Sequence, residues 1–173
     1  MNNSTYLEAV ENEEFRQEFL DGIDLEPYTR FIRRVKYSPQ DKKWYMRCKH
    51  SRFEFLGLKP TIQVSPSAFD IEEVHPNIED FRSTLVFHEG FHASRLDEEG
   101  FVRPDFFDAE GNSFFDALGE LRAYENVIRH LTPQNSDLYK RHIEERRTTY
   151  LGFVRQLDGF EDAHYWLDYV GIK

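Results

Sequence analysis

The sequence predicts an α+β fold in which a small antiparallel sheet packs on a helical bundle. Two patterns support this prediction. Residues 28–65 are rich in Tyr, Phe, Ile, Val and Trp and are interrupted by turn residues, as short strands are. After Pro76 the apolar residues recur every three or four positions, which is the period of amphipathic helices. At 173 residues the chain has the length of one domain, and we expect residues 1–173 to form a single one.

The first third of the chain is expected to contain one helix and then strands. The helix should begin at a Ser4 or Thr5 cap and end near Gly22. The segment 38–41 reads Ser-Pro-Gln-Asp and is expected to form a hairpin turn between the first two strands. Four strands of a meander are predicted, at residues 28–37, 44–49, 52–58 and 61–65.

The remainder of the chain is expected to be mainly helical. One apolar face of the first helix after Pro76 should carry Phe81, Leu85, His88, His92 and Leu96. The acidic segment 97–112 is predicted to be a loop. A second helix, beginning near residue 114, should stop near residues 132–133, and a third should begin at residue 136. A short aromatic helix over 163–170 is expected to close the chain.

The composition favours a cytoplasmic protein. The chain has one cysteine, Cys48, so it forms no internal disulfide, which fits a reducing compartment. It has no apolar run long enough to cross a bilayer, and its N-terminus has no signal-peptide pattern.

Charge is distributed unevenly along the chain. Residues 28–59 contain ten Lys and Arg against two acids, a charge of +8 within a chain of net charge −10. Such a segment can bind a polyanion or be neutralised by the rest of the fold.

One segment of the predicted helices has the residue pattern of a zinc site. It reads His88-Glu89-Gly90-Phe91-His92, which places two imidazoles at positions i and i+4 of a helix. Two neutral imidazoles at this spacing can bind one transition-metal ion. In this pattern Glu89 is expected to act as general base on the water that the metal activates. The sequence therefore predicts one zinc ion held by His88 and His92.

A catalytic zinc ion commonly has three protein ligands and an open position for water. Three kinds of third ligand are compatible with the sequence. One is Glu98, six residues after His92, although Arg95 stands where that arrangement requires a glycine. Another is an aspartate of the following loop: Asp97, Asp105 or Asp108. The third is Glu120 on the next long helix, with Glu125 as the second choice on that helix.

With these residues, the sequence resembles the gluzincin family of zinc metallopeptidases over about residues 61–130. In that family a Glu from a downstream helix completes the HExxH site, and a small residue often stands three positions later. Glu120 and Ala123 match this pattern. The resemblance therefore implies a minimal zincin-like domain with Glu120 as the third metal ligand.

The resemblance also implies how the site is supported. The family commonly has an aspartate after the small residue to orient a ligand histidine, whereas this chain has Tyr124. We expect Glu125, Asp116 or a backbone carbonyl to take that role.

The resemblance also indicates where a substrate would lie. In zincins an extended peptide lies along the strand before the motif helix, which here would be residues 61–65. Six side chains could donate to a developing oxyanion: His130, His142, His164, Tyr124, Tyr150 and Tyr165.

The function implied by the resemblance is zinc-dependent hydrolysis of peptide bonds, with Glu89 as the base. The expected partner is a peptide or protein substrate. No membrane partner is expected, and no nucleic-acid partner either, because no nucleic-acid-binding motif accompanies the basic segment.

Two alternative functions are compatible with the sequence. One alternative is a catalytically inactive zinc-binding domain with an interaction or regulatory role. Another is a polyanion-binding protein that acts through residues 28–59. A site of two His and one Glu can also hold Fe, Co, Ni or Mn.

Overall fold

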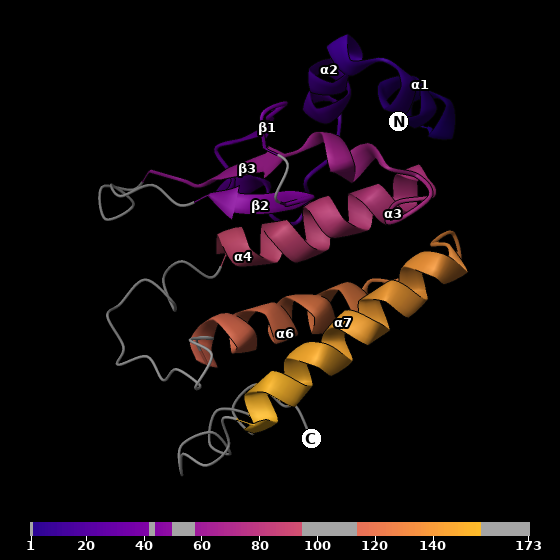
Figure 1. Ribbon diagram of the computed structural model, residues 1–173. Helices are drawn as coiled ribbons and strands as arrows, with labels where there is room; N and C mark the ends of the chain where they lie inside the picture. Colours follow the sequence, from indigo (N-terminus) through magenta and orange to yellow (C-terminus); the bar gives the residue numbers. More distant parts are fainter. Residues whose placement is uncertain (1, 42–43, 50–57, 95–113, 157–173) are drawn as a thin grey trace.

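A computed structural model of the chain describes residues 2–41, 44–49, 58–94 and 114–156. Its elements form layers: a three-stranded sheet, then the helix that carries the HExxH motif, then the long helices α6 (Phe114–Arg129) and α7 (Asp137–Gln156) (Figure 1). This arrangement confirms the predicted α+β class. The predicted loop 97–112, the predicted helix 163–170 and all but the last residue of the predicted strand 52–58 lie outside the described residues.

The N-terminal segment forms two helices instead of the single one expected. Helix α1 (Asn3–Glu11) is capped by Asn2, whose side chain accepts from the backbone N–H of Thr5 at 3.1 Å. Asn2 therefore takes the capping role that was expected of Ser4 or Thr5. A second asparagine, Asn12, ends α1 and accepts from the N–H of Glu14, starting the turn that leads into α2 (Arg16–Asp21). Both caps follow the preference of asparagine for helix N-termini.

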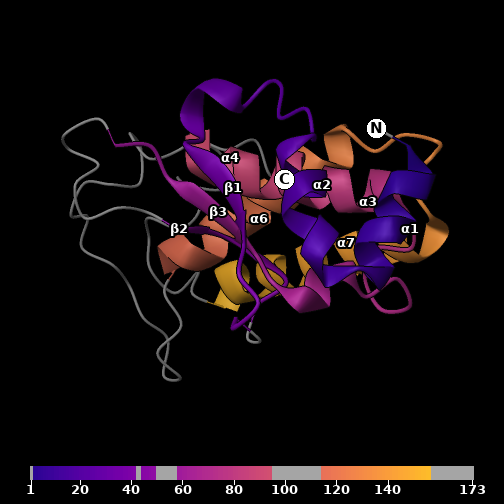
Figure 2. The same cartoon turned by 90° about the horizontal axis from the view of Figure 1, so that it is seen from above.

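The sheet is mixed, and the predicted antiparallel meander is wrong in its order. Strands β1 (Arg34–Tyr37), β2 (Met46–Lys49) and β3 (Thr61–Val64) lie in the order β1-β3-β2, with β3 parallel to β1 and antiparallel to β2 (Figure 2). Residues 38–41 turn, but they do not join a hairpin, because β3 lies between the two strands. The strand predicted over 28–37 is limited to 34–37, and Thr29–Phe31 forms a 3₁₀ turn.

The position of β3 follows from its side chains. Ile62 and Val64 are completely buried, whereas β1 and β2 each carry two cationic residues. A central strand has both edges paired and one face against the core, so the most apolar strand is favoured there.

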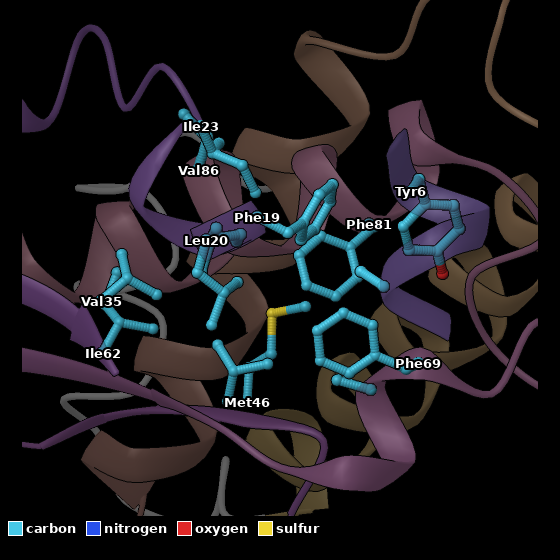
Figure 3. Packing of buried hydrophobic residues seen from close by; sticks show 14 of the residues in the cluster. Tyr6, Phe19, Leu20, Ile23, Val35, Met46, Ile62, Phe69, Phe81 and Val86 are labelled. Atoms are coloured by element: carbon cyan, nitrogen blue, oxygen red, sulfur yellow. The ribbon is translucent and has the colours of Figure 1, made fainter. Parts of the chain in front are cut away.

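Rings make up much of the core, as the sixteen Phe and nine Tyr of the sequence suggest. Tyr6, Phe19, Phe69 and Phe81 pack with centroid distances of 5.0–6.5 Å between α1, α2, the sheet and the motif helix (Figure 3). The four rings are at most 3% exposed. Their tilted and edge-on contacts each contribute about 0.5–1.5 kcal/mol beyond area burial.

The motif helix comprises α3 (Ile78–Arg82), a π-helical segment (Ser83–Glu89) and α4 (Gly90–Ser94). A π turn holds more residues than an α turn, so residues beyond it are rotated relative to a 3.6-residue period. The single face expected from the sequence is therefore divided. Phe81 and Leu85 belong to the core cluster that includes the sheet, whereas His88 and His92 face α6.

A buried polar chain connects the segment before the motif helix with α7. His75 is completely buried; its Nδ1 lies 2.8 Å from the carbonyl of Ala68 and its Nε2 lies 2.9 Å from Thr84 Oγ1. Thr84 Oγ1 lies 2.9 Å from the hydroxyl of Tyr139. Because a carbonyl only accepts, Nδ1 carries the proton. In the neutral ring that burial favours, Nε2 then accepts from Thr84, and Thr84 accepts from Tyr139. This arrangement requires a neutral imidazole.

Helix α7 begins where the sequence predicts, at a Ser136 cap whose Oγ accepts from the N–H of Tyr139. The buried carboxylate of Asp80 accepts from the N–H of Ser136 and from the side chain of Asn135, which joins α3 to the start of α7.

Helix α6 ends at Arg129, just before the predicted stop at 132–133. No described helix combines the length and the apolar character of a membrane span.

We expect the free energy of unfolding to fall as the pH is lowered from 6.5 to 4. Burial lowers the pKa of His75 from 6.5 to about 4, against the raising effect of the Ala68 carbonyl. Between these values the unfolded chain binds a proton that the folded chain does not, so stability rises with pH and is fully present above 6.5. This one group contributes up to about 1.4 kcal/mol per pH unit.

Urea unfolding at several pH values between 4 and 7 measures this effect. A His75→Gln variant lacks the titrating group, so its stability should depend less steeply on pH than that of the wild type in this range. Parallel curves for the two proteins would contradict the assignment.

Candidate metal centre

The two histidines of the motif lie on the same side of the motif helix. His88 is the penultimate residue of the π-helical segment and His92 lies in α4, with ring centroids 5.0 Å apart. His88 is only 6% exposed. Two imidazoles are thus presented together to the neighbouring helix α6, as the sequence predicts.

Glu120 of α6 faces both imidazoles. Its Oε2 lies 3.3 Å from His88 Nε2, and its Oε1 lies 3.3 Å from His92 Nε2. The ligand atoms of the three residues lie within 4.8 Å of one another, and this is the one such group of His, Cys, Asp or Glu among the described residues. The structure therefore brings together the three residues singled out as ligands in the sequence.

The spacing of these atoms fits a shared ion. Nitrogen and oxygen ligands lie about 2.0–2.1 Å from zinc, so two corners of a tetrahedron around it are roughly 3.3–3.4 Å apart. A direct hydrogen bond from a charged imidazole to a carboxylate is shorter, about 2.7–2.9 Å. The observed 3.3 Å matches the first value, and two imidazoles with one carboxylate are ligands that zinc prefers.

The other carboxylates considered as third ligands are not part of this group. Glu125 pairs with Arg147 of α7. Asp97, Glu98, Asp105 and Asp108 lie outside the described residues.

The electrostatics of Glu120 favour its ionised form. Burial by itself raises the pKa of this carboxyl, but the two histidines beside it outweigh burial and hold the pKa well below its usual range. Glu120 is therefore a carboxylate at neutral pH, as a metal ligand must be.

Glu89 lies beside the three residues but is not one of them. It is 5% exposed, and its carboxylate accepts from the backbone N–H of Cys48 in β2. Burial raises the pKa of Glu89, and the charge of Glu120 adds to the rise, whereas the two histidines and the Cys48 N–H oppose it. A buried carboxyl next to a possible metal position can exchange a proton there.

The π-helical segment is tied to α6 by residues that the sequence did not single out. The side-chain amide of Asn126 donates to the carbonyl of Phe87 at 2.6 Å and to the hydroxyl of Tyr28 at 3.0 Å. The Tyr28 side chain packs closely over Gly90, where an added Cβ would lie 2.8–3.0 Å from its Cδ2, Cγ and Cβ atoms. The only signal in the sequence is a glycine inside a helical pattern, which often marks a close approach.

Packing, rather than a hydrogen bond, holds the ring of His88. Its Nδ1 is buried and has no hydrogen-bond partner among the described residues, so the expected support from Glu125, Asp116 or a backbone carbonyl does not reach it. The ring of Tyr124 lies against it instead, at a centroid distance of 4.5 Å. Tyr124 shares a hydrogen bond with Arg146 of α7, and burial raises its pKa, so its hydroxyl stays protonated.

The strand nearest the centre is β2, and the expectation for residues 61–65 as the edge strand is wrong. β3 is paired on both sides, which leaves β1 and β2 as the outer strands. The outer edge of β1 is closed by Gln17 of α2, which accepts from the N–H of Tyr37 and donates to the carbonyl of Val35. The edge of β2 faces the motif helix, where Cys48 meets Glu89.

We expect Gly90→Ala to destabilise the protein by about 1–3 kcal/mol, which is typical of overpacking. The new methyl group would meet Cβ, Cγ and Cδ2 of Tyr28, and the Cβ cannot move without the backbone. Gly152→Ala in α7 is the matched control, because nothing lies within 4 Å of a Cβ there. That control should be neutral or stabilising by about 0.5–1 kcal/mol. Equal effects of the two substitutions in urea unfolding would contradict the close packing of Tyr28.

Comparison with protein-family models, with curated proteins and with solved structures returns no match for this chain. The geometry of the candidate centre is therefore the basis for a functional proposal.

Proposed function

We propose that the protein is a zinc-dependent peptidase whose metal ligands are His88, His92 and Glu120. The observation that carries the proposal is the 3.3 Å separation of each Glu120 oxygen from the Nε2 atom of one histidine. This separation suits a shared ion better than a hydrogen bond. Fe, Co, Ni or Mn can occupy the same donor set, so the ion is named from the preference of two imidazoles and one carboxylate for zinc.

In the proposed reaction the residues have distinct roles. The ion, when bound, supplies a Lewis acid that polarises the scissile carbonyl and activates water. Glu89 takes the proton of the attacking water and passes it to the leaving amine. We assign the stabilisation of the oxyanion to the hydroxyl of Tyr124, one helical turn after Glu120, whose ring lies against His88.

The outer strand β2 beside Glu89 supports a peptide as the substrate. An extended peptide can add to the edge of a sheet through backbone hydrogen bonds. The β1 edge is occupied by Gln17, whereas the β2 edge lies beside Glu89. A peptide that lies along β2 would therefore present its backbone next to the proposed base.

The position of Glu89 favours catalysis over the alternative of an inactive zinc-binding domain. A structural zinc site has no need of a buried carboxyl beside its ligands, and burying one costs free energy. The chain nevertheless buries Glu89 at 5% exposure and gives it a backbone donor from β2. We propose a cytoplasmic location, because a chain with a single cysteine, Cys48, forms no internal disulfide and fits a reducing compartment.

Glu120→Gln should remove the metal while the fold remains. The amide is a much weaker ligand than a carboxylate, and it leaves the two histidines without their third partner. Elemental analysis should give about one zinc per wild-type chain and little in the variant, with circular dichroism unchanged. Glu125→Gln is the matched control, five residues along the same helix, and should keep its zinc. Loss of zinc from both variants, or from neither, would contradict the ligand assignment.

Glu89→Gln should keep the metal and lose hydrolysis. The amide has the volume of the carboxyl but cannot take a proton, and loss of a general base typically costs about 10²–10⁴-fold in rate. The measurements are zinc content and cleavage of an unfolded protein substrate. A variant that loses its zinc would show that Glu89 is a ligand. A fully active variant would show that another group is the base, and a zinc-loaded wild type that cleaves nothing would favour the inactive domain.

A further inference from the structure

A polar and aromatic cluster lies where α7 packs along α6 (Figure 1). Glu120 and Tyr124 stand four residues apart on α6, and Arg146 and Tyr150 stand four residues apart on α7, so each pair shares one face of its helix. The rings of Tyr124 and Tyr150 stack at a centroid distance of 5.7 Å and an interplanar angle of 21°. The two faces therefore meet, which brings Arg146 to the side of α6 that carries Glu120.

The neighbours of Arg146 orient it within this cluster. Its guanidinium shares a hydrogen bond with the hydroxyl of Tyr124, and its charge acts on Tyr150 and Glu120. Burial raises the pKa of Tyr150, the charge of Glu120 adds to the rise and Arg146 opposes it, so Tyr150 lies close to both charged groups. The ring of Tyr124 also lies against His88, with 4.5 Å between the centroids. One tyrosine side chain thus separates the guanidinium from a proposed metal ligand.

Arg146 differs from the arginine next to it. Arg147 is half-buried and pairs with Glu125 of α6. Arg146 is exposed and forms no ion pair with a carboxylate in the described part of the chain, where the oxygens of Glu120 face the two histidines. A guanidinium has five N–H donors, and a hydrogen bond to a neutral tyrosine hydroxyl cancels none of its charge. Its remaining donors suit a carboxylate that comes from outside the chain.

We propose that Arg146 binds a carboxylate of the substrate and thereby determines specificity. The inference rests on the proposed function, because the ligand is the peptide that the metal centre would cleave. A guanidinium forms paired, charge-assisted hydrogen bonds with a carboxylate and weaker ones with neutral amide or hydroxyl groups. Peptides carry carboxylates at the free C-terminus and on the side chains of Asp and Glu. Either source supplies the group that Arg146 recognises.

The position of Arg146 limits where this carboxylate stands in the substrate. The guanidinium lies one tyrosine side chain away from His88, and the carbonyl to be cleaved would lie at the ion that His88 helps to hold. Consecutive Cα atoms are about 3.8 Å apart, so a carboxylate at Arg146 belongs to a residue within a few positions of the scissile bond. A terminal carboxylate there would lead to release of short C-terminal fragments, whereas a side-chain carboxylate would direct cleavage to sites near Asp or Glu.

Peptide binding to the zinc-loaded Glu89→Gln protein tests the inference without turnover. The probes are three fluorescent peptides of the same length: a neutral peptide of Ala and Gln with an amidated C-terminus, the same peptide with a free C-terminus, and the amidated peptide with Glu in place of Gln. Fluorescence anisotropy should show that at least one carboxylate peptide binds about tenfold more tightly than the neutral peptide, the lower end for a hydrogen bond to a charged group. A higher salt concentration should reduce the difference.

Substitutions of two arginines of α7, made in the same background, locate the effect. Arg146→Gln should abolish the preference for the carboxylate peptide, and Arg146→Lys should restore part of it, because an ammonium keeps the charge but not the fork of donors. Arg141→Gln is the matched control, since Arg141 is also exposed but lies about 140° around the helix, and it should leave the preference intact. Zinc content and thermal unfolding check that each variant keeps its metal and its fold.

Several results would overturn the inference. Equal binding of the three peptides, or no measurable binding of any, would show that the protein does not recognise a carboxylate. The same loss in Arg146→Gln and Arg141→Gln would show a diffuse effect of positive charge. A preference that survives Arg146→Gln would place the carboxylate on the ion instead of on the arginine.

The outcomes also separate this inference from the peptidase proposal. Equal cleavage of the three peptides by the wild type would overturn the inference and leave the peptidase proposal standing. A preference that depends on Arg146, in a protein that cleaves no peptide, would support the inference as carboxylate binding and refute the peptidase proposal. A preference for the free C-terminus alone, or for the Glu peptide alone, supports the inference and identifies the source of the carboxylate.

Discussion

The meeting of Glu120 with His88 and His92 constrains the structure more than any other contact. Each carboxylate oxygen lies 3.3 Å from one imidazole, across the interface between the motif helix and α6. Charged and polar groups are costly to bury unless they have partners, so the two helices must pack in one register for these three side chains to meet. Ala123, fully buried one turn after Glu120, has the small side chain that close packing of α6 requires.

The π-helical segment explains how distant parts of the chain support this register. A π turn leaves backbone groups without the usual intrahelical bonds, and such turns are frequent at functional sites. Here the carbonyl of Phe87 accepts from Asn126, which also donates to Tyr28, and Tyr28 packs on Gly90. The segment before the sheet, the motif helix and α6 are thus joined at the turn that ends in His88 and Glu89. Because these contacts involve three separate segments, the orientation of the motif depends on the whole described fold.

The two edges of the sheet differ in the residues that lie against them. Gln17 satisfies the outer backbone groups of β1, as edge strands are commonly protected from further pairing. The edge of β2 lies beside Glu89, whose carboxylate accepts from the N–H of Cys48. One edge of the sheet is therefore closed by Gln17, and the other meets the buried carboxyl of Glu89.

Local patterns in the sequence were enough to predict the α+β class, the starts of α6 and α7, and the His88–His92 pair, because helical period, capping and i,i+4 spacing depend only on neighbouring residues. Glu120 was predicted from its resemblance to a known family, and its spacing from His88 and His92 agrees with that choice. The sequence alone did not predict that β3 lies between β1 and β2, that Glu125 pairs with Arg147 instead of joining the centre, or that Asn126 links Phe87 to Tyr28. These features were decided by the tertiary structure, because each depends on which residues, often far apart in the chain, become neighbours when apolar surface is buried.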